Sequence, residues 1–427
     1  MSQPLVVWLL QTGEPLHIDP GTHRPMRAMN LANSLVAQGH KVILWSSAYF
    51  HQEKRHRCQG VTTVQVNPNL EIRLIPSPGY KKNISVSRLW DHIVLAKNLR
   101  SLLKQPHTEP DVAFIGYPPI EVASVMVHWL EARGIPCILD VKDQWPHIFT
   151  EAFPQKVRPL AGMMLLPYFS YARKTMSTAT ALTSMADDFL NWAIAFSGRE
   201  RRQEDQVVPL TASDAAISDK ELIDARSWWD NQGIRVGVNR VCFVGSHSPA
   251  FDMTPLRNAA QYFMEHNISC EFVICGDGDS SENWQEMMSG LPNVRFPGWV
   301  DSAQIAALVE RSMASIAPYC NTENFVRSIP NKVLDSLYHG LPILTPLKGE
   351  VTKLLEEHSI GLIYGEHPGK TLEHCVEALI TDTGKRQSMA ENASELYQNR
   401  FSYDTVYSAL VKRIENLAKR FQSDGAR

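Results

Sequence analysis

The chain has 427 residues, of which 44% are hydrophobic and 20% charged, so it is long enough for two domains that each bury a core. Its formal charge of −3 lacks the basic excess of a nucleic-acid-binding protein, and we expect no nucleic-acid partner. No apolar run reaches the length of a membrane span, and residues 5–10 lack the basic flank and cleavage site of a signal peptide. Seven scattered cysteines form no paired metal-ligand motif and indicate a reduced, cytoplasmic protein.

The charge is unevenly distributed along the chain. Residues 1–205 hold 22 Lys and Arg against 17 Asp and Glu, a net charge of +5, whereas the rest holds 20 against 28, a net charge of −8. The excess is concentrated in residues 51–104, where three acidic side chains face ten basic ones: Lys54, Arg55, Arg57, Arg73, Lys81, Lys82, Arg88, Lys97, Arg100 and Lys104. This window is either an ordinary solvated surface or a surface for an anionic membrane or a lipid diphosphate.

The first elements alternate between strand and helix. Residues 5–10 and 42–46 are expected to be buried strands, with a helix over 24–38 between them, which is typical of a doubly wound α/β domain. Ligands of such domains gather at the carboxyl ends of strands, so the polar loop 11–21 should line a cleft. The candidate acceptor-side or phosphate-side residues here are His17, Asp19, Gly21, His23, Arg24 and Arg27. His17, Asp19 and His23 could also mimic a metal site.

Two further segments of the first half offer alternatives. Residues 135–139 form a strand that ends at Asp140, Lys142 and Asp143, and two carboxylates beside a lysine indicate either a functional group or a structural salt-bridge cluster. The Met-rich and aromatic-rich residues 159–174 predict a helix that packs in the core or lies on a lipid surface.

The second half begins after a polar linker at 198–213. A strand at 241–244 leads into Gly245, Ser246 and His247, a small-residue loop that is a candidate phosphate loop. A strand at 272–275 enters Gly276-Asp277-Gly278, where the glycines favour a turn over a metal site.

Residues 328–345 are the most informative stretch, a short helix that leads into a buried strand. Pro330 and Asn331 are helix start signals. Lys332 lies in the first turn, where the helix dipole disfavours a cation, and Asp335 lies one turn later on the same face. A diphosphate would suit Lys332 and the free amides, and Asp335 would accept hydrogen bonds from ribose hydroxyls. The alternative is that both side chains are merely solvated.

This stretch resembles the donor-binding signature of the family 4 glycosyltransferases, which have the GT-B fold. The matching sequence is Ser-Ile-Pro-Asn-Lys-x-x-Asp-x-Leu-x-x-Gly-Leu-Pro-Ile-Leu, followed by Leu347-Lys348-Gly349-Glu350, and it is most similar to the branch in bacterial O-antigen and capsule gene clusters. The family commonly carries two glutamates eight positions apart. Asp335 matches the second, but Arg327 stands at the first position.

The resemblance implies two Rossmann-like doubly wound domains that face a cleft. The expected boundaries are 1–206 for an acceptor-side domain, 207–402 for a donor-binding domain, and 403–427 for a helix that crosses back to the first domain. The implied donor-binding residues are Gly245, Ser246, His247, Trp299, Val300, Ser328, Asn331, Asp335, Gly349 and Glu350. Lys332, Lys142 and Asp143 are the candidate catalytic residues.

The implied activity is transfer of a sugar from a nucleotide diphosphate sugar, in particular a UDP-sugar, to a lipid-linked or polysaccharide acceptor. The sugar would be a hexose or N-acetylhexosamine, transferred with retention and without a metal or cofactor, in surface-glycan biosynthesis. The protein would work in the cytoplasm, with peripheral attachment to the inner face of the membrane. A nucleotide-sugar epimerase and a catalytically weak nucleotide-sugar-binding protein are the competing functions.

Overall fold

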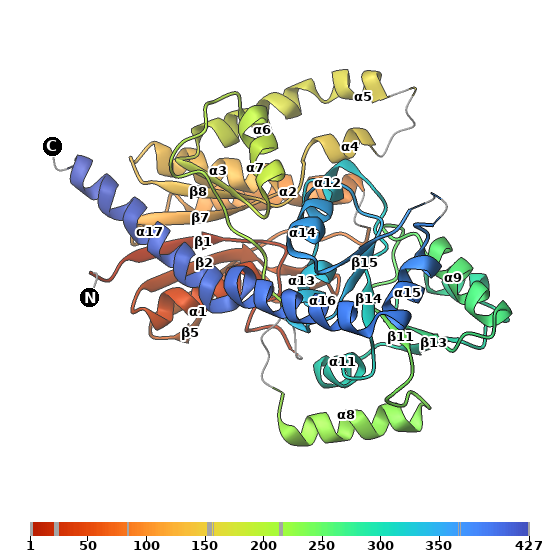
Figure 1. The fold of residues 1–427 in the computed structure, drawn as a ribbon. Coiled ribbons are helices and arrows are strands. Elements are labelled where there is room, and N and C mark those ends of the chain that lie inside the picture. The colour runs from red at the N-terminus through yellow and green to blue at the C-terminus, as the bar shows by residue number, and fades with distance from the viewer. Residues whose placement is uncertain are drawn as a thin grey trace. The chain divides into compact units, whose positions relative to one another are not determined.

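The computed structural model describes residues 3–20, 25–82, 85–151, 156, 158–212, 217–365, 367 and 369–425. It divides into two compact units, one comprising Met1–Pro209 with Val406–Arg427 and the other Leu210–Thr405 (Figure 1). Each unit contains one large sheet with helices on its faces, so the predicted pair of doubly wound α/β domains is confirmed. The first unit ends three residues beyond the expected boundary at 206.

The first unit is built on an eight-stranded sheet with the order β10-β9-β8-β7-β1-β2-β6-β5. All neighbours are parallel except β5, which is antiparallel to β6 at the edge. The strands are β1 Val6–Leu10, β2 Lys41–Ser47, β5 Thr62–Asn67, β6 Leu70–Ile75, β7 Val112–Tyr117, β8 Cys137–Val141, β9 Ala181–Ser184 and β10 Gln206–Val207. A two-stranded ribbon of β3 Tyr49–Phe50 and β4 Arg55–His56 follows β2.

The first unit shows two departures from the sequence prediction, one in its helices and one in the expected linker. Its helices are α1 Arg27–Ala37, α2 Val86–Leu102, α3 Ile120–Glu131, α4 His147–Glu151, α5 Arg158–Met164, α6 Leu166–Thr178, α7 Asp187–Ser197 and α17 Tyr403–Gly425. The single helix expected over 159–174 is two helices, and Pro167 in the first turn of α6 explains the new start, because proline lacks the N–H that would continue α5. The expected linker at 198–213 contains β10, which joins the edge of the first sheet.

The core of the first unit lies between its central strands and the helices α2, α3, α6 and α7. Strands β7 and β8 are buried along their whole length, as the continuous apolar runs predict for a sheet covered on both faces. Trp8 of β1 is fully buried and stacks on Trp129 of α3, with 5.2 Å between ring centroids.

Helix α17 is fixed to the first unit along its length. Arg413 donates to the carbonyl oxygen of Val207 over 3.1 Å, and Glu415 Oε1 lies 3.1 Å from Nε2 of the buried His40. Closer to the end of the helix, Gln422 donates to the Asp111 carboxylate over 2.9 Å. These contacts explain why residues from Val406 onwards group with the first unit although they follow the second in sequence.

The second unit has a six-stranded parallel sheet with the order β13-β12-β11-β14-β15-β16. Its strands are β11 Arg240–Val244, β12 Glu271–Cys275, β13 Val294–Gly298, β14 Ala314–Ile316, β15 Ile343–Thr345 and β16 Gly361–Ile363. Its helices are α8 Asp219–Asn231, α9 Thr254–Glu265, α10 Ser281–Met287, α11 Ser302–Val309, α12 Glu323–Val326, α13 Asn331–Tyr338, α14 Glu350–His358, α15 Leu372–Thr381 and α16 Thr383–Leu396, which continues as the π-helical turn η1 Tyr397–Phe401. The chain reverses its direction across the sheet at β11, which therefore marks the expected ligand edge.

Candidate functional site

Lys332 lies at the point where the second sheet reverses its strand order. Its ammonium donates a hydrogen bond over 2.5 Å to the carbonyl oxygen of Val244, the last residue of β11. The same Nζ lies 4.3 Å from the ring centroid of Phe243 and 5.0 Å from that of Phe251. Burial lowers the pKa of Lys332 to about 8, and the nearby Asp335 opposes this shift only in part. A bound anion would favour the charged form of this lysine.

The loop after β11 approaches Lys332 so closely that a side chain would not fit. Gly245 has a φ of +147°, and a Cβ added there would lie 1.7 Å from Lys332 Nζ. Gly276 and Gly278, after β12, have φ of +123° and +155°, and an added Cβ would meet the carbonyl oxygens of Gly245 and His247 at 2.0 and 2.4 Å. The glycines after two neighbouring strands thus bring two backbone segments together beside the ammonium.

His247 is the buried member of this loop. Its Nδ1 lies 2.9 Å from Ser281 Oγ, and its ring is 4.5 Å from that of Trp284. Burial lowers the pKa of His247, and Lys332 adds to this effect. The backbone N–H of His247 donates to the carbonyl oxygen of Asp277 over 2.9 Å, so its amide holds the turn at 276–278. Ser246, between Gly245 and His247, is exposed.

Helix α13 presents an N-terminus without a side-chain cap. Pro330 occupies the cap position and makes no side-chain hydrogen bond to the first turn. Asn331 is exposed, Asp335 is half-buried one turn beyond Lys332, and Ser328 is buried with its Oγ 3.4 Å from the carbonyl oxygen of Phe325. An uncapped N-terminus with a lysine in its first turn is suited to a phosphate group.

The remaining predicted donor residues are two neighbouring pairs, Gly349 with Glu350 and Trp299 with Val300. Gly349 has a φ of +72°, and an added Cβ would lie 2.1 Å from the carbonyl oxygen of Val326, so the Gly349 backbone closes on the α12 turn. Glu350 follows at the start of α14 and pairs with Lys353 over 2.9 Å. Trp299 is 73% exposed. Val300 is buried in the core of this unit, which leaves only its backbone for a ligand.

Arg327 forms a local ion pair. Its Nη2 lies 3.1 Å from Glu323 Oε2, one turn earlier, and both side chains are substantially exposed. The position that carries an acid in many similar sequences is therefore an arginine that itself faces an acid four residues away.

In the first unit, the predicted Lys142 and Arg27 belong to one buried ionic network. Arg27 Nε lies 3.1 Å from Asp140 Oδ2, and both side chains are almost completely buried. Lys142 Nζ contacts the Glu14 carboxylate and lies 3.9 Å from Asp140 Oδ2. The other Glu14 oxygen accepts from the backbone N–H of Ala28 over 2.8 Å. Two cations and two carboxylates thus balance each other at the carboxyl edge of this sheet.

The predicted residues of loop 11–21 are also held by internal contacts where they are described. Asp19 accepts two hydrogen bonds of 2.7 Å from Arg57, and neither side chain is appreciably exposed. His17 is exposed, with Nε2 3.1 Å from Asn33 Oδ1. The predicted Gly21, His23 and Arg24 lie outside the described residues.

Lys54 and Arg88 of the basic window gather around Tyr80 together with His51. Its hydroxyl lies 2.6 Å from His51 Nδ1, which in turn is 3.1 Å from Lys54 Nζ. Lys54 Nζ and Arg88 Cζ lie 4.9 and 5.5 Å from the Tyr80 ring centroid, and Arg88 also lies 5.1 Å from the ring of Trp145. Burial, Lys54 and Arg88 together lower the pKa of His51 to about 4. The only sequence signal for this group was the basic window that contains Lys54 and Arg88.

Asp143, the second predicted catalytic residue of this unit, borders the Tyr80 group. Burial raises its pKa, and Arg88 and Lys142 act in the opposite direction. Asp143 therefore lies near enough to both Arg88 and Lys142 to interact with their charges.

No group of three or more His, Cys, Asp and Glu suited to hold a metal ion occurs within the described residues.

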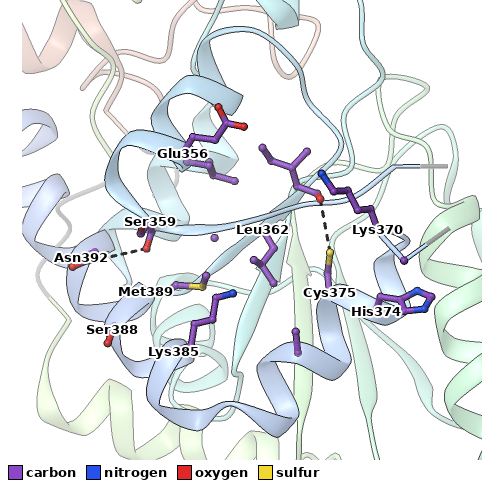
Figure 2. A pocket seen from close by; sticks show the side chains of 15 residues that line it. Glu356, Ser359, Leu362, Lys370, His374, Cys375, Lys385, Ser388, Met389 and Asn392 are labelled. Atoms are coloured by element: carbon purple, nitrogen blue, oxygen red, sulfur yellow. Dashed lines mark hydrogen bonds between the residues drawn. The ribbon is translucent and has the colours of Figure 1, made fainter. Parts of the chain in front are cut away.

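A separate cavity of about 580 Å³ lies in the second unit beside the edge strand β16 (Figure 2). It is lined by α14, β16, α15 and α16, and none of the predicted donor residues is among its lining side chains.

Comparison with known proteins covers both units. The family model described as Glycosyl transferases group 1 matches residues 238–399, which include every predicted donor residue. The structure of sucrose-phosphate synthase from Thermosynechococcus elongatus matches 96% of this chain and 98% of its own, with 12% identity and a TM-score of 0.69. The glycosyltransferase WaaG, involved in lipopolysaccharide biosynthesis, matches 96% and 99%, with 14% identity and a TM-score of 0.64. The chain has the GT-B fold.

A third GT-B structure, HepE from Anabaena in complex with UDP-glucose, matches 96% of this chain and 100% of its own, with 13% identity and a TM-score of 0.63. Among curated protein sequences, none matches this one. A helix long and apolar enough to cross a membrane is absent from the described part of the chain.

Proposed function

We propose that this GT-B protein is a glycosyltransferase that takes a sugar from a nucleotide diphosphate sugar, with UDP as the nucleotide. The observation that carries this proposal is the half-buried Lys332 ammonium beside the Gly245 loop, where the strand order of the second sheet reverses. The match of residues 238–399 to the glycosyl transferase model supports it. HepE, with a similar fold, binds UDP-glucose.

In the proposed reaction, the diphosphate lies between the Gly245 loop and the uncapped start of α13. Lys332 and the free amides stabilise the charge that develops on the leaving nucleotide diphosphate, so that no metal is required. Asp335 accepts hydrogen bonds from the ribose, and the backbone at Trp299 and Val300 faces the base. The sugar, a hexose or N-acetylhexosamine, is transferred with retention, and Lys142 and Asp143 act on the acceptor side.

The proposed acceptor is a lipid-linked glycan of a bacterial surface polysaccharide, reached from the cytoplasmic face of the membrane. Exposed apolar side chains support this part of the proposal: α2 presents Val86, Leu89, Trp90 and Ile93 on one helical face, and α5 and the start of α6 present Leu160, Met163, Met164 and Leu166. Apolar faces flanked by basic residues suit a membrane interface.

The two apolar faces belong to one end of the first unit. His92 of α2 has its Nδ1 3.8 Å from Glu121 Oε2, and Tyr168 of α6 donates to Glu121 Oε1 over 2.7 Å. Helices α2 and α6, which carry the apolar faces, therefore both contact the start of α3.

Vesicle sedimentation tests the membrane part. We expect the protein to bind vesicles that contain anionic lipid at low salt and to leave them as salt screens the charges. Trp90→Glu should weaken binding, whereas Ile223→Glu in α8, an equally exposed apolar residue of the second unit, should not. Equal binding to neutral and anionic vesicles, or equal effects of the two substitutions, would exclude this attachment.

The donor part is tested by incubating the protein with UDP-sugars, with and without lipid-linked acceptors. Acceptor-dependent release of UDP is expected. Conversion of the donor without acceptor would instead identify an epimerase. Tight UDP binding without any turnover would identify a binding protein, the function that Arg327 at the first acidic position favours.

A further inference from the structure

The cavity beside β16 has the size and lining of a small-molecule site. Its volume of about 580 Å³ falls in the range of ligand pockets, roughly 300–1,000 Å³. The apolar lining includes Leu355 of α14, Leu362 of β16 and Met389 of α16. Polar side chains surround Leu362 and Met389 (Figure 2). A ligand with an apolar body and a polar head would match this lining.

Two lysines give the rim its charge. Lys370 precedes α15, and Lys385 lies in the first turn of α16, where the helix dipole opposes a cation. Burial and Glu373 raise the pKa of Cys375 to about 11, and Lys385 and Lys370 act in the opposite direction, so both ammonium groups lie near this thiol together with the Glu373 carboxylate. Among the described residues, neither ammonium forms an ion pair or side-chain hydrogen bond.

The other polar side chains that line the cavity include one carboxylate and one histidine. Glu356 on α14 is the only carboxylate among the lining residues, and His374, in the first turn of α15, adds a further nitrogen. The rim thus holds two lysines and a histidine against one glutamate. An anion is the ligand that this arrangement favours.

The walls of the cavity continue into the candidate donor site. Helix α14 lines the cavity with its last turns and begins at Gly349 and Glu350. Helix α16 packs against α13, the helix of Lys332, and a Cβ added to Gly340 after α13 would lie 2.4 Å from Ser394 Oγ of α16. A ligand that changes the spacing of α14 and α16 would therefore act on both helices of that site.

We propose that this cavity binds a small organic phosphate, with the phosphate at Lys370 and Lys385 and the apolar body on Leu362 and Met389, and that the bound ligand alters nucleotide affinity through α14 and α16. The binding site stands independently of the proposed function, whereas its effect on UDP rests on that function. The competing role for the lysines is protection of the exposed edge of β16 against pairing with another chain.

Calorimetric titration with phenyl phosphate tests the site on the full chain. We expect saturable binding, weakened about tenfold or more by Lys370→Gln and by Lys385→Gln, because each removes a charge-assisted hydrogen bond. Lys220→Gln, at an exposed lysine of α8, is the matched control and should bind like the unmodified protein. Inorganic phosphate should bind more weakly than phenyl phosphate. Equal binding by all three variants, or no binding to the unmodified protein, would overturn the site.

Two further measurements separate this site from the donor site. Lys332→Ala should retain phenyl phosphate binding; loss of binding in that variant would place the probe at Lys332 and overturn the proposal. With phenyl phosphate at saturation, the UDP dissociation constant should change about threefold or more in the unmodified protein and stay constant in Lys385→Gln. An unchanged UDP constant would overturn the coupling and leave the binding site. A protein that binds phenyl phosphate but no UDP would contradict the proposed function alone.

Discussion

The buried Arg27 and the half-buried Lys332 both lie at the carboxyl edge of a doubly wound sheet, but their surroundings differ. Arg27 faces the buried Asp140 at 3.1 Å and shares a network in which Glu14 and Lys142 form a second pair. Lys332 contacts a backbone carbonyl and two aromatic rings, and its pKa falls to about 8 because burial outweighs the effect of Asp335.

We propose that this difference separates a charge that stabilises the fold, Arg27, from a charge that binds a ligand, Lys332. A buried pair satisfies both partners, and its loss leaves an uncompensated charge in the core. In a lysine whose burial is not balanced by a carboxylate of this kind, the charged form is stabilised most when an anion binds beside it. Arg27 should therefore matter mainly for folding and Lys332 mainly for binding and turnover.

Arg27→Met should have the largest effect, a loss on the order of 3–5 kcal/mol of stability in the first unit, because Asp140 would remain buried without its partner. Urea unfolding of the full chain, followed for each unit, measures it. The control is Glu109→Gln, which breaks an exposed pair with Arg133 and should cost about 1 kcal/mol or less. UDP affinity of the folded Arg27→Met protein should not change. A stable Arg27→Met protein with weaker UDP binding would reverse the distinction.

Lys332→Ala should lower turnover on the order of 10²-fold, because the ammonium acts on charge that develops as the nucleotide diphosphate leaves. Steady-state kinetics with a UDP-sugar should show a lower kcat with a smaller change in KM. Intact kcat with a raised KM would make Lys332 a residue that binds donor and transition state equally.

Asp335→Ala should weaken UDP binding by about 1.5–3 kcal/mol, through loss of charge-assisted hydrogen bonds to the ribose. Folding should be unaffected, because the side chain is half-buried on a helix surface. Calorimetry with UDP and with a uridine-free diphosphate separates the ribose contribution. Equal loss with both ligands would show that Asp335 acts through Lys332 instead.

The smallest expected effect is a pH dependence. Because the pKa of Lys332 is lowered to about 8, its ammonium is fully charged only below that pH. UDP affinity should therefore be constant near pH 7 and fall as the pH rises through about 8, with a midpoint raised by the bound diphosphate. This dependence of UDP affinity on pH should disappear in Lys332→Ala. A slope that persists in this variant would assign the titration to another group.

The sequence predicted the fold and Lys332 for the same reason, which is that both depend on local patterns. Alternating apolar runs and helical periods encode the two α/β units, and a lysine in the first turn after Pro330 is visible without any tertiary contact. Strand β16 is only half-buried and begins with Gly361, so it lacks the buried apolar run that predicted the equally short β15.

The pairings in the first unit could not be predicted, because their partners are far apart in the chain. Asp19 meets Arg57, and Arg27 meets Asp140, across separations that no periodicity reports. The Tyr80 group likewise combines loops that follow different strands. The sequence placed Lys142 and Asp143 at a strand end, but the partner of Lys142, Glu14, is 128 residues away in the chain.

The most direct test of the donor site is a calorimetric titration of UDP into the unmodified protein, Gly245→Ala and Gly237→Ala. Both glycines have positive φ, but only at Gly245 would the new Cβ collide with the Lys332 ammonium; at Gly237 nothing lies within 4 Å. We expect one binding site and similar UDP affinity for the unmodified protein and Gly237→Ala. In Gly245→Ala the affinity for UDP should be at least about tenfold lower. Equal affinity in all three proteins, or no binding of UDP to any of them, would contradict it.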